Sequence, residues 1–420
     1  MLFSQYLKQD NLFFKLMTTR ISYKDLKFKE QLGEPEIIRA SFLNNYYFDI
    51  PANDLSAIAK YELEKGDIIF DCSEKKANNK MNLIIENGFS NLIHRVRNKK
   101  TIYIHKNSEI PLIGTNEFGL VDRGSNIIEI KPLTGCNLSC IFCSVKEGKN
   151  DKIDILVEEE YLVEEFKKLA EIKEHDVEAN IGPQGEPLLY PNLVKLVNDI
   201  HKIPNVKVIS INTNGLTLNP KLIDQLKEAG LTRINLSLHA LNKKLASELA
   251  DGPYNINHIL KMIKYCEDKI DVLLAPVFIP GKNEEELDSI IELSKTIKNK
   301  KYPTIGIQNY LNYKGGRNIA KQMPWENFYD LLKQKEKEHN VKLIVTENIF
   351  NIQSDKTLEK PFRKGQIIEA EILSCGRRKN EYLAVAKNRC ITVINPKKTK
   401  GKIKIKLIRD KHNIFLGVTN

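Results

Sequence analysis

Three cysteines lie close together in the sequence, at Cys136, Cys140 and Cys143. Three residues separate the first pair and two separate the second, so one loop can turn three thiolates toward a single metal centre. Iron–sulfur clusters are usually held by four cysteine thiolates, and a set of three leaves one iron open to a ligand that is not protein. A structural zinc site would need a fourth Cys or His close by, and the nearest candidates, Cys72 and His175, are far away in the sequence. The spacing therefore indicates a three-thiolate loop with an open metal position.

This loop, with the aromatic residue Phe142 before its last cysteine, resembles the cysteine loop of the radical S-adenosylmethionine (SAM) enzymes. The resemblance covers about residues 125 to 345. It implies that Cys136, Cys140 and Cys143 are catalytic and hold a [4Fe–4S] cluster, whose open iron binds the amine and carboxylate of SAM. One electron then cleaves SAM to a 5′-deoxyadenosyl radical, and a donor such as ferredoxin or flavodoxin would supply it. Phe142 would lie beside the cofactors.

The chain from residue 126 predicts an α/β fold, a partial (β/α)6 barrel, which is also the fold of the radical SAM family. Strand-like and helix-like segments alternate there, which is typical of βαβ units around a parallel sheet. The predicted strands are 127–132, 177–182, 206–212, 233–238, 272–278 and 304–309, and the predicted helical segments are 157–172, 193–201, 220–229, 243–266, 284–297 and 325–338. The sites of such barrels lie at the C-terminal ends of the strands, and the polar motifs of this chain fall there.

Two motifs, after the second and third predicted strands, resemble SAM-binding elements of the family. Gly185 and Glu186 belong to a Gly-Glu-Pro sequence that resembles the family element that contacts the SAM amine. Gln184 stands where the family has a glycine. Asn212 and Asn214 belong to an Asn-Thr-Asn-Gly sequence like the family's Thr-Asn-Gly turn. The resemblance implies cofactor binding by Gly185, Glu186, Asn212 and Asn214. Structural roles stay open, because Glu186 could cap a helix and Asn214 could form a turn with the following glycine.

The next two strand ends complete the expected SAM site. Ser237 and His239 lie in a Ser-Leu-His-Ala sequence, which resembles the family position that binds the SAM carboxylate and ribose. Val277 and Ile279 resemble the element that lines the adenine. Structural readings stay open here too, since a histidine at a strand end often has only a structural role. Residues 283–286 also form a capping box at the start of a helix.

Residues 1–120 predict a small α/β domain without a recognisable motif. Its predicted strands are 67–71 and 100–105, and its predicted helices are 55–64 and 81–87. We interpret Cys72 as a buried apolar residue, with an additional cluster ligand as the alternative. The core domain is expected at 121–346, ending in a strand at 341–345, and a linker at 347–360.

The basic excess of the chain is confined to its end. Residues 360–420 contain 16 Lys and Arg against 4 Asp and Glu, whereas the rest contains 49 against 50. Short strand-like runs lie at 365–373, 381–386, 390–394, 402–407 and 414–417. In residues 402–406 lysine alternates with isoleucine, which places the lysines on one face of a strand. The pattern is typical of a five-stranded OB-like β-barrel, and residues 361–420 resemble the TRAM domain, an RNA-binding barrel.

The composition places the chain among soluble globular proteins, with 41% hydrophobic and 28% charged residues. It has no apolar run of the roughly 18 residues that a membrane helix needs, and its first residues lack the pattern of a signal peptide. Seven cysteines, of which three lie in one loop, do not suggest a disulfide framework. We expect a cytoplasmic protein that does not bind a membrane.

These patterns predict a radical SAM enzyme that modifies a nucleoside in structured RNA, with tRNA as the expected partner. The basic barrel would bind phosphates, whose contacts give affinity but no sequence information. The loop 308–317 would meet the nucleoside, unless it is a self-bonded surface loop. Methylthiotransferases need a second three-cysteine cluster, and this chain offers only Cys72 for it; a methyl-carrying Cys375 would lie in the barrel. The alternatives are a radical SAM enzyme that acts on a protein, lipid or small-molecule cofactor, and a non-catalytic RNA-binding iron–sulfur protein.

Overall fold

The computed structural model describes residues 18–31, 33, 36–147 and 152–419. These residues form two compact units, which divide between Tyr103 and Ile104. Residues 1–17 of the predicted N-terminal domain lie outside the described residues, and the four-part division of the chain stays a prediction. None of the described helices combines the length and the apolar character needed to cross a membrane.

The first unit contains two antiparallel sheets and the helices α2 and α3. One sheet has the order β1-β6-β5, and in the other β2, β3, β4, β7 and β8 follow one another. The bounds are β1 (Thr18–Ile21), β2 (Leu26–Gln31), β3 (Ile37–Phe42), β4 (Tyr46–Pro51), α2 (Ala52–Ser56), β5 (Tyr61–Glu64), β6 (Asp67–Asp71), α3 (Glu74–Phe89), β7 (Ile93–His94) and β8 (Lys99–Ile104). The predicted strand 67–71 is confirmed.

The helix predicted at 55–64 is wrong. Helix α2 ends at Ser56, and residues 61–64 form β5, which pairs with β6 in a hairpin. Lys65 and Gly66 connect these strands with φ values of 53° and 86°. Two central residues at positive φ make the tight turn that matches the twist of paired strands. The turn therefore favours a hairpin in this segment, although the spacing of its apolar residues is helix-like.

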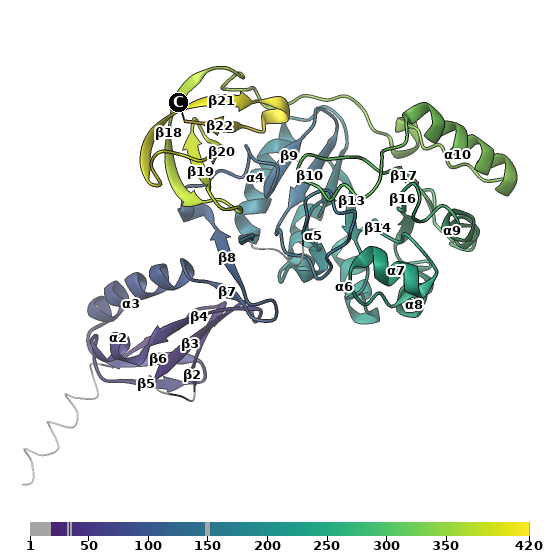
Figure 1. Cartoon of the computed structure of the whole chain (residues 1–420). Coiled ribbons are helices and arrows are strands. Elements are labelled where there is room, and N and C mark those ends of the chain that lie inside the picture. The colour runs from purple at the N-terminus through teal and green to yellow at the C-terminus, as the bar shows by residue number, and fades with distance from the viewer. Residues whose placement is uncertain (1–17, 32, 34–35, 148–151, 420) are drawn as a thin grey trace, which may run out of the picture. The chain divides into compact units, whose positions relative to one another are not determined.

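The second unit begins with a mostly parallel sheet in the order β15-β14-β13-β12-β10-β9, in which only β9 is antiparallel to its neighbour (Figure 1). A separate parallel pair, β16 and β17, continues the curve through a bridge between Leu274 and Ile305. The bounds are β9 (Gly119–Asp122), β10 (Ile127–Lys131), β12 (Val177–Ile181), β13 (Val206–Thr213), β14 (Arg233–Leu236), β15 (Asp271–Leu274), β16 (Val277–Phe278) and β17 (Gln308–Asn309). The predicted α/β barrel is confirmed, although Pro276, which has no N–H to donate, splits its fifth strand.

Helices connect these strands, as the alternating pattern predicted. Their bounds are α4 (Glu159–Glu171), α5 (Leu193–His201), α6 (Pro220–Ala229), α7 (Lys243–Ala250), α8 (Ile256–Cys266), α9 (Glu286–Lys295) and α10 (Trp325–His339). Helix α6 has the predicted bounds because its ends are encoded locally. The Asn219 side chain accepts the Leu222 N–H at the start, and Gly230 ends the helix at a φ of 104°.

Two segments of this unit differ from the prediction. Residues 154–157 form an additional strand, β11 (Asp154–Val157). The strand predicted at 341–345 is wrong, because the N–H groups of Leu343 and Ile344 donate to the Glu336 carboxylate instead of to a neighbouring strand. The predicted linker also contacts the core, where the Gln353 N–H donates to the Asn126 side chain.

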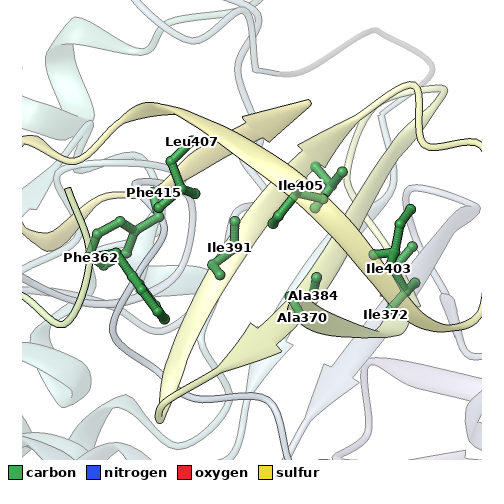
Figure 2. Packing of buried hydrophobic residues seen from close by; sticks show 10 residues of the cluster. Phe362, Ala370, Ile372, Ala384, Ile391, Ile403, Ile405, Leu407 and Phe415 are labelled. Atoms are coloured by element: carbon green, nitrogen blue, oxygen red, sulfur yellow. The ribbon is translucent and has the colours of Figure 1, made fainter. Parts of the chain in front are cut away.

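The last segment is a closed five-stranded barrel, as predicted. Its strands follow the order β18-β19-β20-β22-β21 and close by the pairing of β18 with β21. The bounds are β18 (Ile367–Cys375), β19 (Glu381–Ala386), β20 (Arg389–Ile394), β21 (Gly401–Arg409) and β22 (Leu416–Val418). Alternation on β21 buries Ile403, Ile405 and Leu407 in the barrel core (Figure 2). The lysines between them are exposed.

Main-chain hydrogen bonds and buried charge both join the barrel to the parallel-sheet core. The N–H groups of Cys390 and Phe415 donate to the carbonyls of Ile113 and Gly114. Gly114 lies so close to β20 that a Cβ there would be 1.9 Å from the Cys390 carbonyl oxygen. On the other side, Arg377, in the turn between β18 and β19, makes two parallel bonds of 2.6 and 2.8 Å to Glu147, which follows the cysteines. Both side chains are buried. The barrel and the cysteine loop therefore share one buried ion pair.

The ion pair predicts an asymmetric response to substitution. Arg377→Met leaves the Glu147 carboxylate buried without its partner, and breaking such a pair costs about 3 to 5 kcal/mol. The double variant Arg377→Met/Glu147→Met should recover part of this loss, because two apolar side chains of similar size need no desolvation of charge. Recovery is partial because the buried Asp154, 3.8 Å from Arg377, still loses its cation. Urea unfolding of the wild-type chain, both single variants and the double variant measures the coupling. Additive losses would contradict it.

Candidate functional site

A cavity of about 320 Å³ lies where the cysteine loop meets the C-terminal ends of the parallel strands. The residues predicted from the sequence to bind cofactors line it together, with one exception. They are Cys136, Cys140, Phe142, Cys143, Gly185, Glu186, Asn212, Asn214, Ser237, His239 and Val277. The exception is Ile279, which is buried outside the lining and whose N–H donates to the Asn283 side chain at 2.8 Å. Asn283 also donates to the His239 carbonyl, so this segment supports the cavity wall.

The cysteine loop follows β10 and turns three sulfurs toward the cavity. The Leu138 N–H donates to the Cys136 sulfur at 3.4 Å, and the Glu147 N–H donates to the Cys143 sulfur at 3.3 Å. Burial raises the pKa of the Cys140 thiol to about 12 and also raises the pKa of Cys136. Because metal ligands must be thiolates, a metal that binds here has to displace protons from buried thiols.

The spacing of the sulfurs fits a cluster better than a single ion. Sulfurs on one tetrahedral zinc lie roughly 4 Å apart, since each Zn–S bond is about 2.3 Å. Among the described residues, the sulfurs of Cys136, Cys140 and Cys143 do not all lie within 4.8 Å of one another. A multi-iron centre, with its wider sulfur spacing, suits the three thiolates.

Arg317, from the loop after β17, fixes the backbone of the cysteine loop. Its guanidinium donates to the carbonyl oxygens of Ser139, Cys140 and Glu147, at 3.1 Å for Cys140 and 3.2 Å for Glu147. The backbone N–H of Arg317 donates to the Cys143 carbonyl at 3.1 Å. The sequence placed Arg317 in a possible substrate loop, whereas the structure gives it a role beneath the metal site.

Glu186 is buried at the strand ends and organises them. Its carboxylate accepts the N–H of Leu188 and the hydroxyl of Thr213 on one oxygen, and the N–H of Asn214 on the other. Burial raises its pKa to about 7, although the three donors oppose this shift. The proposed helix-capping role and the cavity-lining role therefore coexist, because Glu186 caps a short turn while it faces a site that suits a cation.

The side-chain amides of the two asparagines each donate and accept a hydrogen bond within the protein. Asn212 donates to Asn180 at 2.8 Å and accepts from Asn235 at 3.0 Å, so a polar ladder inside the barrel holds it. The Asn214 side chain donates to Asn137 at 2.8 Å and accepts the Leu216 N–H. Asn214 thus ties the end of β13 to the cysteine loop and also forms the turn expected of it.

His239 is held as a neutral donor. Its Nδ1 accepts the N–H of Val277 at 3.1 Å, which leaves the proton on Nε2. Burial lowers its pKa to about 4. Its ring meets the edge of Phe142, with 4.6 Å between centroids. A neutral Nε2–H in the cavity wall can donate to an oxygen without adding charge.

Comparison with known proteins gives the family. A sequence model of the radical SAM superfamily matches residues 130–294. The chain therefore contains a domain of the radical SAM superfamily. It is 41% identical to an uncharacterized protein of Methanocaldococcus jannaschii, over 80% of this chain and 84% of that one. It is also 32% identical to the GTP 3′,8-cyclase of Limosilactobacillus fermentum over 41% of this chain, and it spans about half of that enzyme (52%). Among solved structures, Streptococcus suis SuiB bound to S-adenosylmethionine covers 77% of this chain and 72% of its own, at 14% identity and a TM-score of 0.41.

As a radical SAM protein, the chain uses a [4Fe–4S] cluster and SAM. Cys136, Cys140 and Cys143 would hold the cluster, which supplies the electron for SAM cleavage. The buried Glu186 carboxylate suits the SAM amine, and the neutral His239 suits an oxygen of its ribose or carboxylate.

Sequence reasoning about the radical SAM site missed residues that act through others. Tyr254 donates to the carbonyls of Asn214 and Ser237, at 3.0 and 3.1 Å, and so joins two strand ends. Gln184 lines the cavity, and its amide nitrogen, in the orientation that satisfies its neighbours, donates to the carbonyls of Asn116 and Glu117. Gln184, at the position where the family has a glycine, therefore fixes this loop to the backbone of Asn116 and Glu117. Cys375 does not line the cavity, and its methyl-carrying role stays untested.

Glu186 predicts a pH dependence of stability in the cluster-free chain. Its pKa of about 7 lies above the ordinary value of 4.5, so the folded state keeps a proton that the unfolded state loses between these values. This contribution to stability is present at low pH and is lost as the pH rises to 7, by about 3 kcal/mol in total. Glu186→Gln removes it. Between about pH 5 and about pH 8, the unfolding free energy of the wild type should therefore fall relative to that of Glu186→Gln. Equal pH profiles would contradict the assignment.

Proposed function

We propose that this protein is a radical SAM enzyme that modifies a nucleoside in structured RNA, with tRNA as the first substrate to test. The observation that carries the proposal is the basic barrel fixed beside the cavity. The end of the chain holds 16 Lys and Arg against 4 Asp and Glu, and Arg377 joins it to the cysteine loop. A basic module bound to the catalytic unit suits a polyanionic substrate, because phosphate contacts release condensed counterions.

The charge of the barrel is not spread evenly. On β21 the exposed lysines face β18, where Glu371 lies opposite Lys402 and Glu369 opposite Lys404. These acids reduce the field of the lysine face. Exposed cations without such partners on the adjacent strand lie in the turn between β20 and β21, at Lys397, Lys398 and Lys400. We expect this turn, more than the strand face, to meet phosphates.

The division of labour follows from the kinds of contact. Phosphate contacts position a nucleic acid without reading its sequence, so the nucleoside must be selected at the cavity mouth. A base in a stack cannot reach a buried radical, and enzymes that act on such bases take the nucleotide out of the stack. The exposed Tyr313, which lines the cavity, offers a ring for a displaced base.

A free nucleotide is the second candidate substrate, because the chain is 32% identical to a GTP 3′,8-cyclase over 181 residues. This belongs to the small-molecule class of alternatives. A free nucleotide offers a few phosphates at one point, whereas RNA offers a phosphate at every nucleotide across a basic module with 16 Lys and Arg, which is why RNA is preferred. A protein or lipid substrate has no such support from the charge distribution.

The proposed function predicts two measurable properties. The anaerobically reconstituted and reduced enzyme should release 5′-deoxyadenosine from SAM, which a binding protein with a structural cluster would not do. It should also bind tRNA with an affinity that falls steeply with salt, by a slope of about 0.7 to 0.9 per phosphate contact. Nucleoside mass spectrometry of RNA from cells that lack the gene would identify the product. Cleavage of SAM without salt-dependent RNA binding would favour the free nucleotide.

A further inference from the structure

Three distant segments meet at one side of the cavity mouth. Gly316 packs against the cysteine loop, where a Cβ on it would lie 3.1 Å from the Ser144 carbonyl oxygen. A Cβ on the neighbouring Gly315 would lie 3.4 Å from Nη2 of Arg378, in the β18–β19 turn of the barrel. Tyr313, from the same loop as these glycines, lines the cavity and is 48% exposed. The barrel therefore reaches the mouth of the catalytic cavity itself.

Charge is layered in this region, with acids beneath and cations at the surface. Glu147 is buried under Arg377, and Glu381 is nearly covered and bonds Arg378 at 3.1 Å. Arg378 also lies 3.8 Å from the largely covered Glu117. Above them Lys146, Lys314 and Lys379 are exposed, and the Arg378 side chain is 43% exposed. Tyr313, which lines the cavity, its neighbour Lys314, and Arg378 and Lys379 of the β18–β19 turn beside Gly315 are called the mouth rim below.

We propose that the mouth rim binds a phosphate group of the nucleotide whose nucleoside enters the cavity. Lysine and arginine side chains are the groups that recognise phosphate, and arginine does so with a planar fork. Tyr313, between them and the cavity, suits the ring or sugar of the same nucleotide. The barrel then supplies part of the substrate site and does more than hold RNA at a distance.

The inference deepens the proposed function and rests on it where the phosphate belongs to RNA. A free nucleotide would offer the same chemistry, so both sources have to be measured. Glu381 already orders the Arg378 side chain and offsets part of its charge, so the net positive charge of the rim comes from the exposed Lys314 and Lys379. Preorganised cations lose little side-chain freedom when they bind an anion.

The experiment uses the full-length chain with its cluster and SAM, and measures the binding of tRNA and, separately, of GTP over a range of salt concentrations. The test variants are Arg378→Gln and Lys314→Gln/Lys379→Gln; the second changes only exposed side chains. The matched control is Lys387→Gln/Lys406→Gln, which removes two exposed charges toward the other ends of β19 and β21. Cluster content and thermal midpoint equal to wild type show that a variant is folded.

We expect each rim variant to weaken tRNA binding about tenfold and to lower the salt slope by about one per lost contact, with a clearly smaller effect in the control. If wild type binds tRNA and the rim variants match the control, the rim inference is overturned while the proposed function stands. If wild type binds only GTP and the rim variants weaken that binding, the rim stands and the RNA function falls. Binding of neither ligand by wild type overturns both.

Discussion

The structure depends on a buried ion pair between two parts of the chain that are 230 residues apart, Glu147 and Arg377. Removing two charges from water costs several kcal/mol each, and only close, fully hydrogen-bonded contact repays it. The pair therefore tolerates little displacement of either partner. Since Glu147 also donates its N–H to the Cys143 sulfur, the position of the barrel and the position of a cluster ligand are fixed by the same residue.

Arg317 adds a second restraint of a different kind. It holds the cysteine loop by its carbonyl oxygens, 177 residues from Cys140 in the sequence. The described loop residues 132–147 have almost no regular structure of their own, so their backbone groups must find partners elsewhere. Arg317 provides some of these partners, and the carbonyls of Ala250 and Leu249 accept the N–H groups of Ser139 and Ile141. A short motif can name the metal ligands, but only the completed fold holds them in place.

This distinction explains what the sequence could predict. Motifs at strand ends predicted the residues that share the cavity, because parallel strands bring their C-terminal ends to one edge. Helix α6 was predicted to its last residue, since Asn219 and Gly230 mark its ends locally. Residues 61–64 and 341–345 were assigned wrongly, because a two-residue turn and the distant Glu336 carboxylate decided their backbone. The partners of Arg317 and Arg377 have no local signature, so spacing and periodicity could not find them.

The same reasoning applies to charge. A count along the sequence gives the barrel a large positive excess, but charge acts on a ligand only where it is exposed and not already neutralised. Glu147 neutralises Arg377 in a buried ion pair, and Lys402 and Lys404 lie opposite glutamates on β18. Much of what remains lies in turns at the barrel ends, and the β18–β19 turn reaches the loop that lines the cavity. The field that a substrate meets is thus set by the pairing of strands and by the docking of the barrel.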